Sequence, residues 1–103
     1  MVALATLKAI ADRLRDQYRA ERVLVFGSVA RGESSAHSDI DLLVIGPTKE
    51  RFYERIGSVL AIVREISPGI PLAPIVLTPE ELATRLARGD QFVEEIVRTG
   101  VEL

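Results

Sequence analysis

The sequence contains no cysteine among its 103 residues, so disulfide bonds and thiolate metal sites are excluded. Basic residues are not in excess either. The 13 lysines and arginines are outnumbered by 15 acidic residues, which gives a formal net charge of -2 and a pI near 5.4. Strong binding to bulk DNA or RNA is therefore not expected, because such binding needs a basic surface for the phosphates.

Long hydrophobic runs are also lacking, since a membrane span needs about 20 apolar residues in a row. The N-terminal segment carries Lys8, Asp12 and Arg13 within its apolar spacing, which differs from a secretory signal peptide. We therefore expect a cytoplasmic protein without membrane association. The remaining composition is that of a globular chain, and its length predicts one domain over residues 1–103.

Apolar spacing predicts alternating helices and strands along the chain. Apolar residues three and four positions apart predict helices over residues 4–18, 52–66, 79–88 and 90–99, with one short helical turn at 29–31. Short apolar runs predict strands over residues 23–26, 39–45, 72–77 and, at the end of the chain, 101–103. This order predicts the α/β (α+β) class, with a small mixed β-sheet of three to four strands and flanking helices.

The third predicted strand contains Pro71 and Pro74, which remove two backbone donors. Such a strand is expected near a sheet edge or a bulge. The helix that follows it has a strong start signal. Thr78 occupies the N-cap position, Pro79 the first helical position, and Glu81 can close a capping box.

The most informative stretch joins the first two predicted strands. The first strand ends abruptly in Gly27-Ser28, and after ten further residues Asp39 and Asp41 stand one residue apart in the second apolar run. Side chains alternate along a strand, so both carboxylates are expected on one face and their apolar neighbours on the other. Asp39 could instead cap a loop, but a loop role would leave Asp41 unexplained.

Two neighbouring carboxylates repel each other, and burial strengthens that repulsion, so a divalent cation is expected between Asp39 and Asp41. Mg²⁺ fits because it takes one or two carboxylates and completes its shell with water and substrate phosphates. Gly27 lets the backbone approach a ligand closely, and the amides after it favour an anion. The Ser28 hydroxyl and the Arg31 guanidinium could bind the same anion. Ser28 as a simple helix N-cap and Arg31 as a solvated surface residue are the structural alternatives.

These residues carry a family resemblance. Gly27-Ser28, Arg31-Gly32 and residues 38–44 resemble the signature of the DNA polymerase beta nucleotidyltransferase superfamily, and most closely the minimal nucleotidyltransferases. The resemblance implies the nucleotidyltransferase fold and binding of a nucleoside triphosphate, with ATP expected. It implies that Gly27, Ser28 and Arg31 bind the nucleotide. It also implies that Asp39 and Asp41 are the catalytic residues that hold Mg²⁺.

The chain departs from the family pattern at one position. Complete members carry a third carboxylate on the next strand, and registration on residues 77–80 places that position at or near Ala73. The loss predicts retained nucleotide binding with weakened transfer, or a replacement acid supplied from elsewhere. Glu65 and the acids of the last two helices are candidates, and the loop residue His37 is a weaker candidate for proton transfer.

The resemblance also implies a partner. Minimal nucleotidyltransferases are often paired with a helical HEPN-domain protein in a toxin–antitoxin arrangement, and in some pairs they adenylylate the toxin. The acceptor platform is expected from such a partner or from a second copy of the chain. The predicted function is Mg²⁺-dependent transfer of a nucleoside monophosphate, AMP from ATP, to a hydroxyl of the partner. The alternative is a catalytically impaired antitoxin that neutralises the partner by binding. Transfer to a small molecule is disfavoured.

Overall fold

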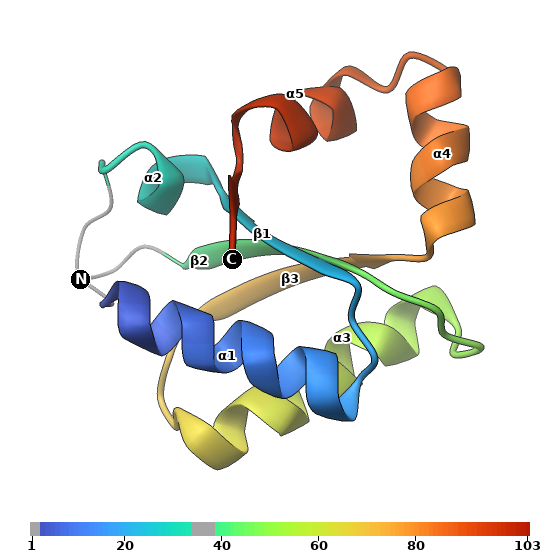
Figure 1. Cartoon of the computed structure of the whole chain (residues 1–103). Coiled ribbons are helices and arrows are strands. Elements are labelled where there is room, and N and C mark those ends of the chain that lie inside the picture. Colours follow the sequence, from blue (N-terminus) through green and yellow to red (C-terminus); the bar gives the residue numbers. More distant parts are fainter. Residues whose placement is uncertain (1–2, 34–38) are drawn as a thin grey trace.

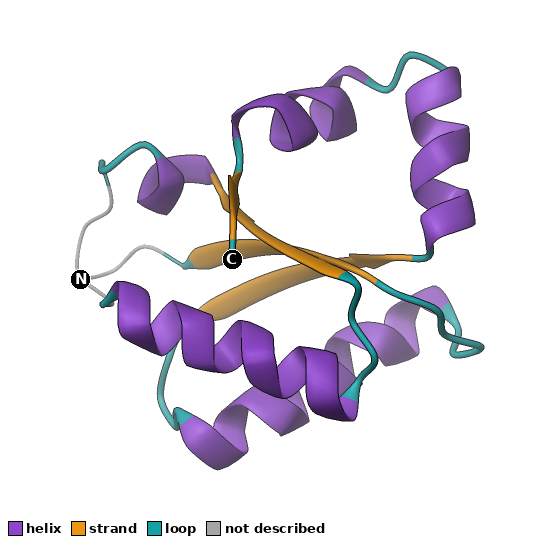
Figure 2. Cartoon of the chain, viewed as in Figure 1, coloured by secondary structure: helices purple, strands orange, loops and turns teal. Residues whose placement is uncertain are grey.

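The computed structural model describes residues 3–33 and 39–103 of the chain, which form a central sheet with helices on both sides (Figure 1). The elements in chain order are α1 (Leu4–Gln17), β1 (Arg22–Phe26), α2 (Gly27–Ala30), β2 (Ile40–Ile45), α3 (Phe52–Ile66), β3 (Leu72–Leu77), α4 (Pro79–Ala87), α5 (Gln91–Thr99) and β4 (Val101–Glu102). Figure 2 shows α1 and α3 on one side of the sheet and α4 and α5 on the other. The predicted α/β class is confirmed.

The sheet has four strands in the order β3-β2-β1-β4. Strand β1 runs antiparallel to both β2 and β4, whereas β2 and β3 are parallel, so the sheet is mixed as predicted. Asp41 on β2 is the register partner of Phe26 on one side and of Ala73 on the other. Three strands therefore contribute neighbouring positions around Asp41.

Strand β3 lies at an edge of the sheet, as Pro71 and Pro74 predicted. The Ile40 N–H donates to the Pro71 C=O (2.8 Å), and the Gly46 N–H donates to the Leu77 C=O (3.1 Å). Because alternate residues of a parallel strand bond to the same neighbour, the odd-numbered residues of β3 face β2. The Pro74 nitrogen therefore points away from the sheet, where its missing N–H breaks no ladder bond.

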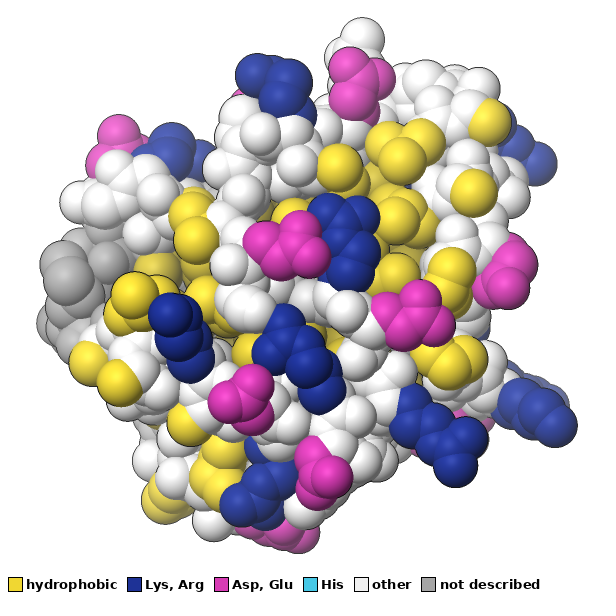
Figure 3. Space-filling model, viewed as in Figure 1, with side chains coloured by type: hydrophobic (Ala, Val, Ile, Leu, Met, Phe, Trp, Pro, Cys, Tyr) yellow, Lys and Arg dark blue, Asp and Glu magenta, His cyan; other side chains and the backbone are white. Residues whose placement is uncertain are grey.

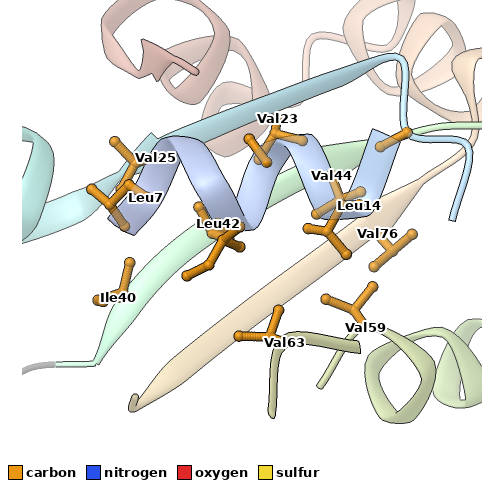
Figure 4. Close-up of a cluster of buried hydrophobic side chains, with 13 residues drawn as sticks. Leu7, Leu14, Val23, Val25, Ile40, Leu42, Val44, Val59, Val63 and Val76 are labelled. Carbon is orange, nitrogen blue, oxygen red and sulfur yellow. The ribbon is translucent and has the colours of Figure 1, made fainter. Parts of the chain in front are cut away.

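The larger hydrophobic core fills the space between the sheet and the pair α1 and α3 (Figure 4). Its buried members are Leu7, Ile10, Ala11, Leu14, Ala20, Val23, Val25, Ile40, Leu42, Val44, Val59, Val63 and Val76. A second cluster lies on the opposite face, under α5, and contains Leu24, Leu43, Ile45, Leu77, Val93 and Ile96. Successive residues of β2 alternate between the two clusters, which is the expected pleat of a strand covered on both sides.

A buried arginine connects the two helical layers. Arg55 on α3 is only 6% exposed and donates to the Val76 C=O (3.1 Å) and to both carboxylate oxygens of Glu81 on α4 (2.6 and 3.3 Å). Glu81 also accepts from the Thr78 N–H (2.8 Å), and Thr78 accepts from the Glu81 N–H (3.1 Å). The predicted capping box is therefore present and is joined to a buried ion pair.

The predicted starts of the short helix and of β2 are wrong. The short helix begins at Gly27 rather than Val29, and β2 begins at Ile40, so Asp39 precedes the strand instead of opening it. His37, the weaker candidate for proton transfer, falls within residues 34–38, which lie outside the described residues. Within the described part of the chain, no helix combines the length and apolar composition required to cross a membrane.

Candidate functional site

The turn after β1 is built around a direct approach between Gly27 and Asp41. Gly27 has a φ of +71°, which favours glycine, and a Cβ placed on it would overlap Asp41 Oδ2 and lie 3.3 Å from Asp41 Cγ. The carboxylate of β2 thus rests against the backbone that ends β1. The sequence prediction of a close backbone approach at Gly27 matches this contact, although here the neighbour is the protein's own carboxylate.

The negative charge of Asp41 is only partly compensated by its surroundings. Partial burial raises the pKa of its carboxyl above the ordinary value of 3.8, and the Asp39 carboxylate raises it further, while the Arg31 guanidinium lowers it. Asp39 is exposed and precedes the strand, yet it lies close enough to repel Asp41. The pair offers hard oxygen donors in a place where a cation would remove the repulsion.

Ser28 and Arg31 belong to the short helix α2 and the residue after it. Ser28 is not the N-cap, because Phe26 occupies that position and makes no side-chain capping bond. Arg31 is the C-cap residue, and its Nε donates to Glu33 Oε2 (2.9 Å) in an exposed ion pair. Arg31 is therefore a surface residue that lies near Asp41, and its binding of an anion stays a prediction.

The structure places Ala73 directly beside Asp41 through the β2–β3 register. Glu65, one of the acids considered from the sequence, instead lies near Arg13 of α1 (3.6 Å), on the helix pair that covers the opposite face. Within residues 3–33 and 39–103, no group of three or more histidine, aspartate or glutamate side chains could hold a metal together. The described carboxylates at this site are Asp41, the nearby Asp39, and Glu95 of α5, one of the acids considered from the sequence, which lines the same cavity as Asp41.

A cavity of about 620 Å³ opens beside Asp41, within the 300–1,000 Å³ of typical ligand sites. Most of its lining is apolar. The lining residues are Phe26, Gly27, Arg31, Asp41, Ile56, Leu60, Leu72, Ala73, Pro74, Ile75, Phe92, Glu95, Ile96 and Thr99. Gly27, Arg31 and Asp41 are the predicted site residues that it brings together, whereas Ser28 and Asp39 are not part of the lining.

Sequence reasoning considered the acids of α5 as replacement carboxylates but missed the contribution of its other residues to this cavity. Four of its residues line the cavity: Phe92, Glu95, Ile96 and Thr99. Their spacing of three, four and seven residues is the signature of one helix face, and it was visible in the sequence. The apolar neighbours Val93 and Ile96 masked this signal, because they made α5 resemble an ordinary core helix.

A comparison with known families identifies the family of the chain. A model of the family described as "Nucleotidyltransferase domain" matches residues 7–100, which is most of the chain. The chain belongs to the nucleotidyltransferase domain family. The resemblance drawn from Gly27-Ser28 and from the Asp39 and Asp41 pair is therefore confirmed at the level of the family.

Relatives of this nucleotidyltransferase domain come from archaea. Two proteins of Methanocaldococcus jannaschii, both named as candidate protein adenylyltransferases, are 38% identical over 42 residues and 40% identical over 48 residues. These segments cover 39% and 43% of the chain, and 42% and 48% of the relatives. The matches thus span less than half of each relative's length.

A solved structure also resembles the domain. The crystal structure of a candidate nucleotidyltransferase from Sulfolobus solfataricus superposes with a TM-score of 0.59 at 27% identity. The superposition covers 79% of the chain and 71% of that structure. The nucleotidyltransferase fold expected from the sequence is therefore confirmed.

Proposed function

We propose that the chain is a Mg²⁺-dependent nucleotidyltransferase that transfers a nucleoside monophosphate, AMP from ATP, to a hydroxyl of a partner protein. The observation that carries this proposal is the Asp41 carboxylate, held against the Gly27 turn at a cavity large enough for a nucleotide. The names of the two archaeal relatives favour a protein as the acceptor. Both the reaction and the acceptor are proposals for this chain.

The donor set fits Mg²⁺. Asp39 and Asp41 supply the hard oxygen ligands that this ion prefers, and their mutual repulsion is the kind of strain that a cation relieves. When bound, Mg²⁺ would neutralise charge on the phosphates of the nucleotide. The catalytic assignment of Asp39 and Asp41 rests on this chemistry.

The remaining residues would position the triphosphate. Gly27 and Ser28, at the start of α2, would present backbone and hydroxyl donors to its β- and γ-phosphates. Arg31 lines the same cavity and would add positive charge. The hydroxyl oxygen of the acceptor would form a bond to the α-phosphorus, and the bond to the β-phosphate would break as pyrophosphate leaves. Positioning and charge neutralisation supply the rate in such transfers.

The acceptor we propose is a helical HEPN-type protein, with this chain as the antitoxin of the pair. The face of the molecule in Figure 3 has interspersed basic and acidic side chains and no continuous basic stripe. Together with the net charge of -2, this disfavours bulk nucleic acid as the partner.

One observation favours a second candidate function, neutralisation of the partner by binding alone. The position beside Asp41 on β3 is occupied by Ala73, where an acid would assist the entering hydroxyl. If transfer depends on that acid, the domain would bind nucleotide and partner without modifying the partner.

The test is transfer of label from [α-³²P]ATP. The chain is incubated with Mg²⁺, with and without the product of its neighbouring gene, and the variants Asp41→Ala and Asp41→Asn are assayed in parallel. Asp16→Asn is the matched control, because it makes the same chemical change at an exposed position of α1. We expect label on the partner with the native chain and with Asp16→Asn, and none with either Asp41 variant.

A stable complex of the two proteins without label, under any nucleoside triphosphate, would replace the transferase by the binding antitoxin. Label that persists in both Asp41 variants would show that the catalytic assignment is wrong.

A further inference from the structure

One side of α5 forms a wall of the cavity that also contains Asp41. Phe92, Glu95, Ile96 and Thr99 all line that cavity. The last three lie three, four and seven residues after Phe92, so the four side chains occupy one face of the helix. The other walls come from Phe26 of β1, from β3, and from Ile56 and Leu60 of α3. The cavity thus runs from Asp41 to a helix face that carries both apolar and polar side chains.

Phe92 is the most unusual residue of this wall. Its side chain is large and apolar, yet it is 55% exposed, whereas Val93 and Ile96 beside it are buried. Its ring meets the ring of Phe26 edge to face, with the centroids 5.9 Å apart and the planes at 82°. An edge-to-face pair leaves one ring face uncovered, so the wall presents an aromatic surface for stacking.

The register of the sheet places the aromatic pair next to Asp41. Phe26 is the β1 partner of Asp41, and Gly27 follows it directly. A ligand that reaches Phe92 and binds Asp41 through a cation combines an anionic group at one end with a flat apolar group at the other. A nucleoside triphosphate has this distribution, since its phosphates are joined through the ribose to an aromatic base.

We propose that the α5 face is the nucleobase site and that the ring of Phe92 stacks on the base. This inference rests on the proposed function, because the phosphates of the same nucleotide are assigned to Gly27, Ser28 and Arg31. Stacking on an aromatic ring tolerates every base, because each has a π-face. The wall therefore supplies affinity for the nucleoside and little discrimination between bases.

The chain contains no tryptophan, so one introduced at position 92 is a single fluorescent reporter. Phe92→Trp keeps an aromatic ring in the wall. We expect Mg²⁺–ATP to change its emission and Mg²⁺–tripolyphosphate, which has no base, to leave the emission unchanged. Tyr53→Trp is the matched control, because Tyr53 is an exposed aromatic residue on α3 outside the cavity lining, and its emission should respond to neither ligand.

Affinity is measured with the same two ligands. Phe92→Leu keeps apolar bulk but removes the ring face, and thermal unfolding confirms that the variant is folded. We expect it to weaken Mg²⁺–ATP binding about 5- to 100-fold, the range for loss of one aromatic stacking partner, and to leave tripolyphosphate binding unchanged. Asp41→Asn should weaken binding of both ligands together.

The outcomes separate this inference from the proposed function. If neither ligand binds the native chain, both proposals fall. If tripolyphosphate binds and Phe92→Leu leaves ATP affinity unchanged, the nucleobase site is wrong while the phosphate and metal assignment stands. An unchanged affinity for ATP together with weaker use of the acceptor would assign the wall to the acceptor, which also overturns the inference.

Discussion

The two faces of the sheet are built for different purposes although they share the same strands. The face under α1 and α3 is filled by 13 buried hydrophobic residues, and the one buried charged side chain described there is Arg55 of α3 beside β3. The face under α4 and α5 has only six buried residues, and the space beside them is the cavity that contains Asp41. One layer stabilises the fold and the other provides the candidate site.

Strand β2 shows the division most clearly. Leu42 is completely buried in the face under α1 and α3, whereas Asp41, its neighbour, faces the cavity. A carboxylate next to the core of a small domain is tolerated because the pleat turns it to the open side. A change at Leu42 should therefore lower stability, whereas a change at the adjacent Asp41 should weaken ligand binding without lowering stability.

The largest expected effect on stability is that of Leu42→Ala. The side chain is 0% exposed, and truncation of a buried leucine leaves a cavity, so we expect a loss of about 3 kcal/mol in the free energy of unfolding. Asp41→Asn should not lower stability but should abolish Mg²⁺–ATP binding. Urea unfolding and nucleotide titration measure the two quantities. Equal destabilisation by both variants would contradict the division between the faces.

The next effect concerns the Arg55–Glu81 ion pair, which connects α3 on one side of the sheet to α4 on the other. Glu81→Ala removes the partner of buried Arg55 and one half of the capping box, and we expect a loss of about 2 kcal/mol. This is below the usual range for a broken buried pair because the Glu81 side chain is 41% exposed. Glu80→Ala, in the same helical turn, is the control, and its change should stay within about 0.5 kcal/mol.

The Arg55–Glu81 ion pair also predicts that the stability of the chain depends on pH. Arg55 holds the pKa of Glu81 below its ordinary value of 4.5. Stability from this pair is therefore present above pH 4.5 and is lost as the pH falls through the lowered pKa. Urea unfolding between pH 7 and pH 3 should show a smaller acid-induced loss for Glu81→Ala than for the native chain.

Most of the fold could be predicted because local patterns agree with the tertiary structure. The helical spacing of residues 52–66, the capping box at Thr78 and the prolines of β3 each found their predicted element. The predicted position of Asp39 failed because the strand begins at its first ladder bond, from Ile40 to Pro71, and this bond depends on a residue distant in sequence.

The candidate site was predictable only where its residues are close in sequence. The alternation that turns Asp41 away from the core, and the need for glycine at position 27, follow from local geometry. The wall supplied by Phe92 and Thr99 depends on how α5 folds back over the sheet, and the ion pair of Arg31 depends on the path after α2. No local pattern specifies either arrangement.

A comparison of Gly27 with Gly32 tests the contact between Gly27 and Asp41. Gly27 and Gly32 have nearly identical φ angles, +71° and +72°, but a Cβ on Gly32 meets no described atom within 4 Å. Gly32→Ala should lose about 1 kcal/mol for its positive φ alone, and Gly27→Ala about 1 kcal/mol more. Nucleotide binding should weaken in Gly27→Ala only. Equal losses of stability in Gly27→Ala and Gly32→Ala would show that Asp41 moves aside without consequence.

The smallest expected effect is a pH dependence at Asp41. Burial and the Asp39 carboxylate raise the pKa of Asp41, so between its ordinary value of 3.8 and the raised value the folded chain binds more protons than the unfolded chain. Stability therefore decreases as the pH rises through this window. Without metal ions, the native chain should lose slightly more stability than Asp41→Asn between pH 3.5 and pH 7. Added Mg²⁺ should abolish that difference.

The outward-facing nitrogen of Pro74 has a consequence for the behaviour of the chain in concentrated solution. Unpaired edge strands are templates for intermolecular strand pairing and for aggregation. Strand β3 is an edge strand whose residues from Leu72 to Leu77 are all apolar, and Arg55 already occupies its Val76 C=O. Pro74 removes the donor at the middle of that edge, so a second strand cannot continue the ladder along it. The same residue lines the cavity, and it therefore keeps the side of the site next to β3 from being covered by another copy of the sheet.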